Sequence, residues 1–189
     1  FLHTSDVTFD ILHNQMEVHQ KYAEPWKVTL VDTGDHTMTG GRVKRIQSYV
    51  NGEPFLLTYG DGVADLNIAQ LVAFHQAHRK HVTVTATQPI GRFGALTLER
   101  DNIVKNFMEK PIGDGGWING GFFVMQPDVF RYIIDDSTTL ERDPMEKLAG
   151  EGELIAFKHY GFWQAMDTLR DKNHLEDLWA SNKAPWKLW

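Results

Sequence analysis

The stretch Gly60-Asp61-Gly62 has the residue types of a metal or phosphate site. Asp61 follows the apolar run Phe55–Thr58, which is typical of a buried strand. In an open α/β sheet, ligands bind just beyond the carboxyl ends of the strands, so this carboxylate would lie at the ligand-binding edge. The two glycines have no Cβ, and the backbone there can come close to a bulky, charged ligand. Because Mg²⁺ prefers hard oxygen ligands, usually one or two carboxylates plus phosphate oxygens, Asp61 is a candidate magnesium ligand.

Other acidic residues also stand near predicted helix starts. Asp65 directly precedes Leu66, and we interpret it as the N-cap of a helix that begins there. Asp61 could also serve only to cap this helix, and this alternative stays open. Asp167 is the second carboxylate of interest; the alternative for it is an N-cap of the helix predicted at Leu169–Trp179, with Thr168 competing for the same duty.

Two further segments place polar residues beside a predicted strand. The strand Ile118–Val124 begins with Asn119-Gly120-Gly121, and a closely bound ligand would account for these glycines. The preceding segment, Glu109-Lys110-Pro111, ends a predicted hairpin; its proline stops the strand ladder and fixes the direction in which the two charged residues project. Surface Glu-Lys pairs are common, so this pair gains interest only from the polar strand that follows it.

The segment Thr39-Gly40-Gly41-Arg42 precedes a helical pattern formed by Val43, Ile46 and Val50. Unpaired N–H groups at a helix start suit an anion or a ring carbonyl. The glycine, threonine and aspartate content around this segment is equally typical of a flexible connector. The residues by themselves leave both interpretations open.

Strands and helices are expected to alternate along the chain. The expected strands are Val7–Leu12, Lys27–Asp32, Phe55–Thr58, Val82–Thr87, Ile118–Val124 and Leu154–Phe157, and Ala95–Leu98 pairs with Ile103–Met108 in a hairpin. The expected helices follow Asp65, Pro127, Glu141 and Thr168. This alternation predicts an α/β protein, a single domain over residues 1–189, with a Rossmann-like central sheet flanked by helices.

Two local patterns in these helices receive structural interpretations. Thr138-Thr139-Leu140-Glu141 fits a capping box for a helix that ends at Gly150. His75, His78 and His81 have helical spacing, and we interpret them as a solvated helix face, since no further zinc ligand is evident.

Composition limits the kinds of partner. Of the 189 residues, 42% are hydrophobic and 23% charged, as in ordinary globular proteins, and no apolar run suggests a membrane segment. The formal net charge of −6 argues against a nucleic-acid binder, which needs clustered Lys and Arg. There is no cysteine, which predicts a reducing compartment such as the cytoplasm. A small phosphate-bearing substrate is compatible with this charge if a metal ion and a few cations hold it.

The chain begins at Phe1 without a methionine and contains no Gly-rich phosphate loop. We therefore expect that an N-terminal portion precedes the sequence.

Taken in order, six motifs resemble the sugar-phosphate nucleotidyltransferases over essentially the whole chain. They are Thr39-Gly40-Gly41-Arg42, Gly60-Asp61-Gly62-Val63-Ala64-Asp65, Gly91-Arg92-Phe93-Gly94, Glu109-Lys110-Pro111, Asn119-Gly120-Gly121-Phe122-Phe123 and Phe162-Trp163-Gln164-Ala165-Met166-Asp167-Thr168. The ordered set is far more specific than any one motif. The family's N-terminal loop of the type Leu-Ala-Gly-Gly-Xaa-Gly-Thr-Arg, and the lysine downstream of it, have no counterpart in the sequence.

The resemblance implies a mixed, mostly parallel sheet of the nucleotide-diphospho-sugar transferase type, incomplete at its N-terminus. It also implies that CTP and α-D-glucose 1-phosphate react to give CDP-glucose and pyrophosphate, at the start of a route to bacterial surface polysaccharides such as O-antigen, in a homo-oligomer. The residues implied as catalytic are Asp61, Lys110 and Asp167, with both aspartates holding Mg²⁺. Sugar-phosphate binding is implied for Gly94, Glu109, Lys110, Asn119 and Gly120, and nucleotide binding for Asp61 and for Thr39, Gly40, Gly41 and Arg42.

Three alternatives to this assignment stay open. The same fold could transfer a uridylyl or thymidylyl group instead. The lack of the phosphate loop also fits a non-catalytic module that binds a sugar nucleotide. A metal-dependent glycosyltransferase is disfavoured, because Asp61 and Asp65 do not form the Asp-Xaa-Asp pair of many such enzymes.

Overall fold

The computed structural model describes residues 6–19, 26–50, 52–89, 95–98, 100–108 and 116–187. The chain divides into two compact units, Phe1–Asp32 and Thr33–Trp189, and each is described by itself. Three predicted site residues, Gly94, Glu109 and Lys110, fall outside the described residues.

The first unit contains a β-hairpin. Strands β1 (Val7–Asp10) and β2 (Gln15–Val18) pair antiparallel, with Val7 opposite Val18. The expected strand Val7–Leu12 therefore ends two residues early, because the Asp10 carboxylate accepts hydrogen bonds from the backbone and ring of His13 and reverses the chain.

A second strand was expected at Lys27–Asp32, and this prediction is wrong for the part that the structure describes. Residues 27–32 have no strand partner and are mostly exposed. The second strand of this unit is instead β2, which lies earlier in the chain. The alternating residues of 27–32 resemble a strand, but a strand forms only where a neighbour satisfies its backbone.

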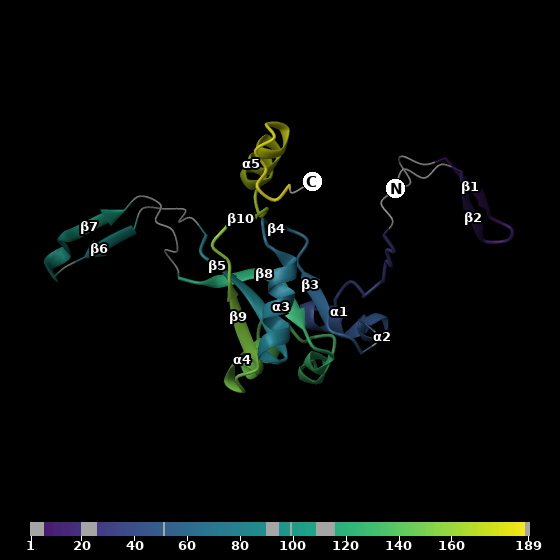
Figure 1. Ribbon diagram of the computed structural model, residues 1–189, viewed down its shortest axis with the longest axis horizontal. Helices are drawn as coiled ribbons and strands as arrows, with labels where there is room; N and C mark the ends of the chain where they lie inside the picture. The colour runs from purple at the N-terminus through teal and green to yellow at the C-terminus, as the bar shows by residue number, and fades with distance from the viewer. Residues whose placement is uncertain are drawn as a thin grey trace. The chain divides into compact units, whose positions relative to one another are not determined.

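The second unit is built on a four-stranded sheet in the order β3-β8-β5-β9 (Figure 1). The strands are β3 (Phe55–Thr58), β5 (Val82–Thr87), β8 (Ile118–Met125) and β9 (Leu154–Lys158). β8 runs antiparallel to both neighbours, and β5 and β9 are parallel, so β3, β5 and β9 point the same way. The predicted Rossmann-like mixed sheet is confirmed, with three of its four strands pointing the same way, and all four of its predicted strands are present.

Helices cover both faces of this sheet because β8 alternates its buried side chains. Phe122 and Val124 face a cluster with Leu71 of α3 (Ile68–His78), which lies over the sheet in Figure 1. Phe123 and Met125 face the opposite cluster. That cluster also contains Val82 of β5. Its other buried members come from α1 (Thr39–Arg45), the 3₁₀ helix η3 (Pro127–Tyr132), α4 (Asp143–Gly150) and the segments around them: Val43, Val129, Phe130, Ile133, Leu140 and Leu148.

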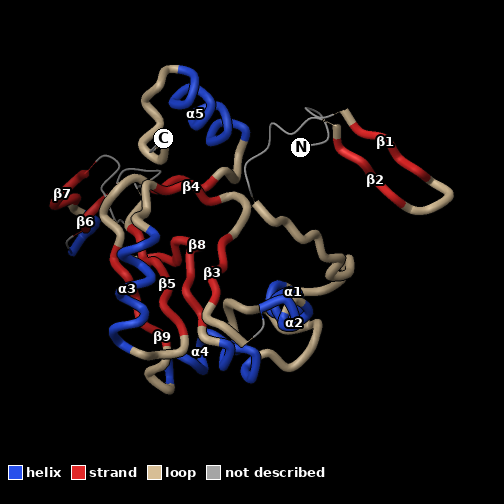
Figure 2. The backbone as a smooth tube through the Cα atoms, turned by 45° about the vertical axis from the view of Figure 1, so that its right-hand side comes forward, coloured by secondary structure: helices blue, strands red, loops and turns tan. Residues whose placement is uncertain are grey.

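Two further helical elements are short, namely α2 (Gln47–Val50) and the 3₁₀ helix η2 (Arg100–Asn102). Helix α5 (Leu169–Ala180) is longer and begins and ends within a residue of its predicted bounds. β6 (Ala95–Leu98) and β7 (Val104–Met108) pair antiparallel, which confirms the predicted hairpin. Figure 2 shows the helices and strands along the backbone trace. Within the described residues, no helix has the length and apolarity needed to span a membrane.

Two predicted helix caps are wrong. The N-cap of α3 is Asn67, whose side chain accepts from the Gln70 N–H, whereas the Asp65 carboxylate lies 3.0 Å from the His159 ring. Helix α4 begins at Asp143, after the expected capping box, because the Glu141 side chain is engaged elsewhere in the structure.

The expected solvated histidine face is also wrong. His75 is only 1% exposed, and its ring bonds to the Thr83 hydroxyl at 2.8 Å and to the Gln126 amide at 2.9 Å. His78 shares the same hydroxyl at 2.7 Å. Since burial penalises the charged form, the pKa values of both His75 and His78 lie below the ordinary value.

Candidate active site

The candidate residues Asp61, Asn119 and Gly120 lie at one edge of the four-stranded sheet. β3, β5 and β9 end at this edge, and β8, which runs the other way, begins there: Thr58 pairs with Phe122, and Thr87 pairs with Ile118. The segment after each of the three strands and the first residues of β8 therefore meet at the carboxyl edge. This is the edge at which open α/β sheets bind their ligands.

A separate two-stranded sheet brings the backbone segments that carry Asp61 and Asp167 to the same end. β4 (Gly62–Ala64) pairs antiparallel with β10 (Trp163–Ala165), with Gly62 opposite Ala165. The ladder continues one step further, since the Met166 N–H donates to the Asp61 carbonyl at 2.8 Å. Asp61 and Asp167, which are far apart in the sequence, thus lie at the same end of one sheet, and both are exposed.

Asp167 does not cap helix α5. The cap is Thr168, whose hydroxyl accepts from the Asp171 N–H at 3.2 Å, while the Asp171 carboxylate accepts from the Thr168 N–H at 3.1 Å. This reciprocal pair is a capping box, which satisfies two donors of the first helical turn. The capping role that was the structural alternative for Asp167 is therefore filled by Thr168.

The two carboxylates suit a hard divalent cation. Exposed carboxylates at a ligand-binding edge can supply the one or two protein oxygens that Mg²⁺ usually takes, with water and phosphate completing the shell. Within the described residues, no group of three or more His, Cys, Asp or Glu side chains could hold a metal by protein ligands alone. Two carboxylates would leave most of the coordination shell to water and to oxygen atoms of a ligand.

A chain of hydrogen bonds crosses the same edge. The Glu141 carboxylate accepts from the Tyr59 hydroxyl at 2.5 Å and from the Thr39 hydroxyl at 2.7 Å. The Tyr59 oxygen in turn accepts from the Asn119 side-chain amide at 3.3 Å. Burial, and then the hydrogen bond to Glu141, raise the pKa of Tyr59 above its ordinary value, so its hydroxyl keeps its proton.

Sequence reasoning missed Tyr59 and Glu141. Tyr59 directly follows the run Phe55–Thr58 and was given no role. Glu141 was interpreted as part of a capping box, and local spacing gives no sign of partners more than eighty positions away. Such contacts depend on the tertiary fold and carry no sequence signal.

The glycines of Thr39-Gly40-Gly41-Arg42 have a packing role. The N–H groups of Gly40 and Gly41 both donate to the Thr138 carbonyl, at 3.0 and 3.3 Å. A Cβ on Gly41 would lie 2.6 Å from the Asp136 Cα, so only glycine fits there. In this structure these N–H groups are occupied by the protein, which accounts for both glycines without a ligand; the role of the segment in nucleotide binding stays a prediction.

Arg42 holds the loop that precedes α1. Its guanidinium donates to the Thr33 hydroxyl at 2.7 Å and to the Asp35 carbonyl at 3.3 Å, while the side chain stays exposed.

Gly120 and Gly121 also have structural reasons. A Cβ on Gly120 would lie 3.0 Å from the Thr85 carbonyl oxygen, and its own carbonyl accepts from the Trp163 indole at 2.8 Å. Gly121 has a φ of 79°, and a Cβ there would meet the Tyr59 ring at 2.8 Å. Close packing at the start of β8 thus explains these glycines, and the predicted contact between Gly120 and a sugar phosphate stays a prediction.

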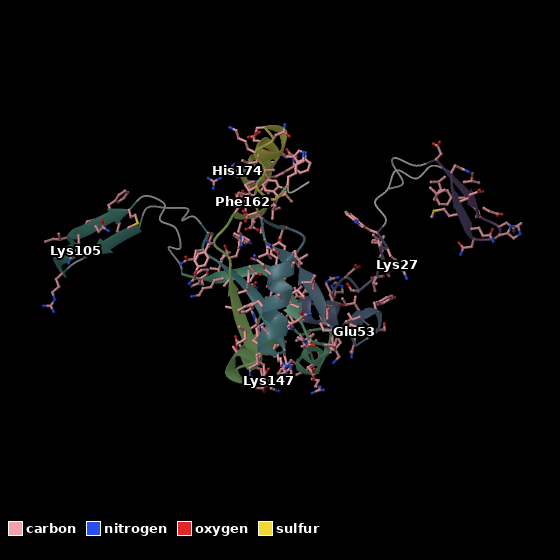
Figure 3. All side chains as sticks on the ribbon, viewed as in Figure 1. Lys27, Glu53, Lys105, Lys147, Phe162 and His174 are labelled. Atoms are coloured by element: carbon pink, nitrogen blue, oxygen red, sulfur yellow. The ribbon has the colours of Figure 1, made fainter. Side chains whose placement is uncertain are left out.

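The C-terminal segment folds back on this region. Trp186 packs against Phe162, which is labelled in Figure 3, with ring centroids 5.3 Å apart. The contact supports the segment that leads into β10 and Asp167.

The sequence of this chain is similar to those of known nucleotidyltransferases. A sequence profile described as nucleotidyl transferase matches residues 8–164. Glucose-1-phosphate cytidylyltransferase of Salmonella typhimurium (strain LT2) is 61% identical over 190 residues, which cover 100% of this chain and 74% of the relative. Probable glucose-1-phosphate cytidylyltransferase of Bacillus subtilis (strain 168) is 43% identical over 167 residues, with 88% of this chain and 65% of the relative covered.

Solved structures support the fold. UDP-glucose pyrophosphorylase complexed with UDP-glucose matches with a TM-score of 0.57 and 13% identity, over 79% of this chain and 64% of the other. HddC from Yersinia pseudotuberculosis matches with a TM-score of 0.55 and 20% identity, over 74% of this chain and 61% of the other.

Proposed function

The chain belongs to the nucleotidyl transferase family, and from this membership we propose that the protein transfers a cytidylyl group from CTP to α-D-glucose 1-phosphate. The products are CDP-glucose and pyrophosphate. The observation that carries the proposal is the β4–β10 pairing, which brings Asp61 and Asp167 to one end of a sheet beside the carboxyl edge. The relatives named above support the choice of base and sugar.

The reaction is an in-line displacement at the α-phosphorus of CTP. An oxygen of the sugar phosphate forms the new P–O bond while the bond to pyrophosphate breaks, so catalysis is chiefly positioning and charge stabilisation. A divalent ion, which we propose to be Mg²⁺, would draw the two polyanions together and offset charge at the α-phosphate when bound by Asp61 and Asp167.

Asn119 is suited to orient the sugar. Its side-chain carbonyl accepts from the Gly121 N–H at 2.9 Å and its amide donates to Tyr59, so the orientation of the amide is fixed. One N–H and one lone pair are left over for sugar hydroxyls. Lys110 remains our choice for the cation on the sugar phosphate, since an ammonium point charge suits a phosphate, with Glu109 and Gly94 beside the sugar.

We further propose that both compact units belong to a single nucleotidyltransferase domain, because the family profile spans residues 8–164 and so includes both. Exposed apolar side chains on the β1–β2 hairpin, among them Phe9, Ile11 and Leu12, support a homo-oligomer that covers them. The proposed location is the cytoplasm, and the proposed pathway is bacterial surface polysaccharide synthesis.

The test is a pyrophosphate-release assay on the intact protein with glucose 1-phosphate and each nucleoside triphosphate. We expect CTP to be preferred over UTP and dTTP, and Asp61→Asn and Asp167→Asn each to lower kcat/KM about a thousandfold, since loss of a metal-bridged contact costs several kcal/mol. Asp143→Asn, at the start of α4, is the control and should keep the wild-type rate. Unchanged rates in both active-site variants would overturn the proposal.

Two other outcomes have clear meanings. Preferred turnover of UTP or dTTP would keep the fold and mechanism but change the base. Binding of CDP-glucose without any turnover would favour the non-catalytic module.

A further inference from the structure

The hydrogen-bonded chain Thr39–Glu141–Tyr59–Asn119 joins four separate parts of the fold. Thr39 begins α1, Tyr59 follows β3, Asn119 lies at the start of β8, and Glu141 precedes α4. Its three links measure 2.7, 2.5 and 3.3 Å. One end belongs to the segment predicted to bind nucleotide, and the other end is the residue suited to the sugar.

The direction of every bond in this chain is determined. The Thr39 hydroxyl donates to Glu141, which leaves its oxygen to accept from the Leu140 N–H at 2.9 Å. The Tyr59 hydroxyl also donates to Glu141, so its oxygen can only accept from Asn119. Reversing any one bond would leave a donor facing a donor, and the four side chains therefore hold one arrangement together.

The Glu141 carboxylate is the centre of the chain. It is half-buried, and each of its two oxygens accepts one bond from a hydroxyl. Hydrogen bonds to an ionised acceptor are about twice as strong as neutral ones, and removal of one partner from such a partly desolvated group is costly. Thr39 and Tyr59 are therefore linked through this one side chain, and Asn119 is linked to it through Tyr59.

We propose that Glu141 is a positioning residue that couples the two substrate-binding segments, so that the nucleotide and the sugar phosphate each bind more tightly when the other is present. The inference rests on the proposed function for the identity of the two ligands. Ligand contacts that fix Thr39 order Asn119 in advance through Glu141 and Tyr59, and the reverse holds by linkage. The sugar phosphate then meets an Asn119 amide that is already oriented.

The experiment measures binding rather than turnover. Calorimetry on the intact protein with Mg²⁺ gives the Kd of glucose 1-phosphate with and without α,β-methylene-CTP, a nucleotide that cannot transfer its α-phosphate. We expect the nucleotide to tighten sugar-phosphate binding about tenfold, within the usual range of coupling between sites. Independent binding of the two ligands to the wild-type protein would overturn the inference.

The informative variant is Tyr59→Phe. It removes the hydroxyl and keeps the ring, which packs edge-on against Phe123 with centroids 5.8 Å apart, so the fold should be retained. In this variant we expect the nucleotide to change the Kd of glucose 1-phosphate by no more than about twofold, while the Kd of the nucleotide alone changes little. Glu141→Gln should lower the coupling as well, and the double variant should lose no more than Tyr59→Phe, because both changes cut one chain.

A second tyrosine–glutamate pair provides the matched control. The Tyr132 hydroxyl donates to the Glu151 carboxylate at 2.6 Å, on η3 and just after α4, and neither residue has a predicted part in the site. Tyr132→Phe and Glu151→Gln should keep the full coupling. If Tyr132→Phe reduced the coupling as much as Tyr59→Phe does, the effect would be one of general stability and the inference would fail.

The inference and the proposed function fail separately. Coupled binding in a protein that forms no CDP-glucose from CTP would overturn only the proposed activity. Normal turnover by Tyr59→Phe with its coupling intact would overturn only the inference.

Discussion

The two ends of the four-stranded sheet use polar residues in different ways. At the end where β5 begins, His75, His78, Gln126 and Thr83 bond to one another in the interior. At the carboxyl edge, Asp61, Asp167 and Asn119 are exposed. Polar groups at the first end are enclosed and bond to one another, whereas those at the second end are exposed, as their proposed roles in ligand binding require.

Metal removal should have the largest effect, and this effect should be on the activity of the carboxyl edge and not on stability. With excess EDTA, we expect the rate of CDP-glucose formation to fall about a thousandfold, equivalent to about 4 kcal/mol, because the phosphates lose their bridging cation. The Tm in the same buffer should change little, since the two carboxylates are exposed and tolerate their own charge. Full activity in excess EDTA would contradict the metal assignment.

Loss of a core side chain should show the opposite pattern. Phe123 is 1% exposed, and Phe123→Ala should lower the free energy of unfolding by about 3–4 kcal/mol through lost burial and the cavity left behind. Urea denaturation measures this change. Phe107 on β7 is 61% exposed, so Phe107→Ala serves as the control and should stay within about 0.5 kcal/mol of wild type.

The buried histidines should make stability depend on pH. Because the pKa values of His75 and His78 are lowered in the folded state, the unfolded chain binds more protons below the ordinary value of 6.5. Stability is therefore fully present above pH 6.5 and is lost as the pH falls towards the folded-state values, by up to about 1.4 kcal/mol per pH unit for each histidine.

His75→Gln should flatten this dependence, since glutamine does not titrate. Urea denaturation between pH 5 and 8 compares the two slopes. Equal slopes in the variant and the wild-type protein would show that the burial of His75 does not control the effect.

The smallest expected effect is at the cap of α5. Thr168→Ala removes the capping box and should cost about 1 kcal/mol of stability, while Thr168→Ser, which keeps the hydroxyl, should cost only a few tenths. Because Asp167 is the adjacent residue, we also expect a severalfold loss of activity in the alanine variant alone. Wild-type activity in that variant would show that the cap does not position the carboxylate.

The sequence alone predicted the sheet well, because its signals are local. The runs at Phe55–Thr58, Val82–Thr87 and Ile118–Val124 are rich in β-branched and aromatic residues, and all three form strands. The placement of Asp61 at the end of a strand follows from the same reasoning. The turn at Asp101-Asn102 likewise lies between β6 and β7, where Asn102 has a φ of 62°.

Three of the errors share one physical cause, namely competition from partners that local spacing does not reveal. Glu141 fits a capping box by spacing, but two hydroxyls from elsewhere in the fold bind its carboxylate. Asp65 stands one turn before a helix, yet His159 is its neighbour. The histidines of α3 look solvated because the pattern cannot show that Thr83 and Gln126 lie opposite them. Local propensity is a weak guide wherever tertiary contacts decide the partner.

The pairing of β4 with β10 has a consequence for folding. The two aspartates belong to segments separated by more than half of the chain, so neither a nascent chain nor a fragment that ends before β10 can hold both. Contacts of such long sequence separation form late, after the costly loop closure between them. Cation affinity should accordingly serve as a reporter of complete assembly, appearing only when the last segment has docked.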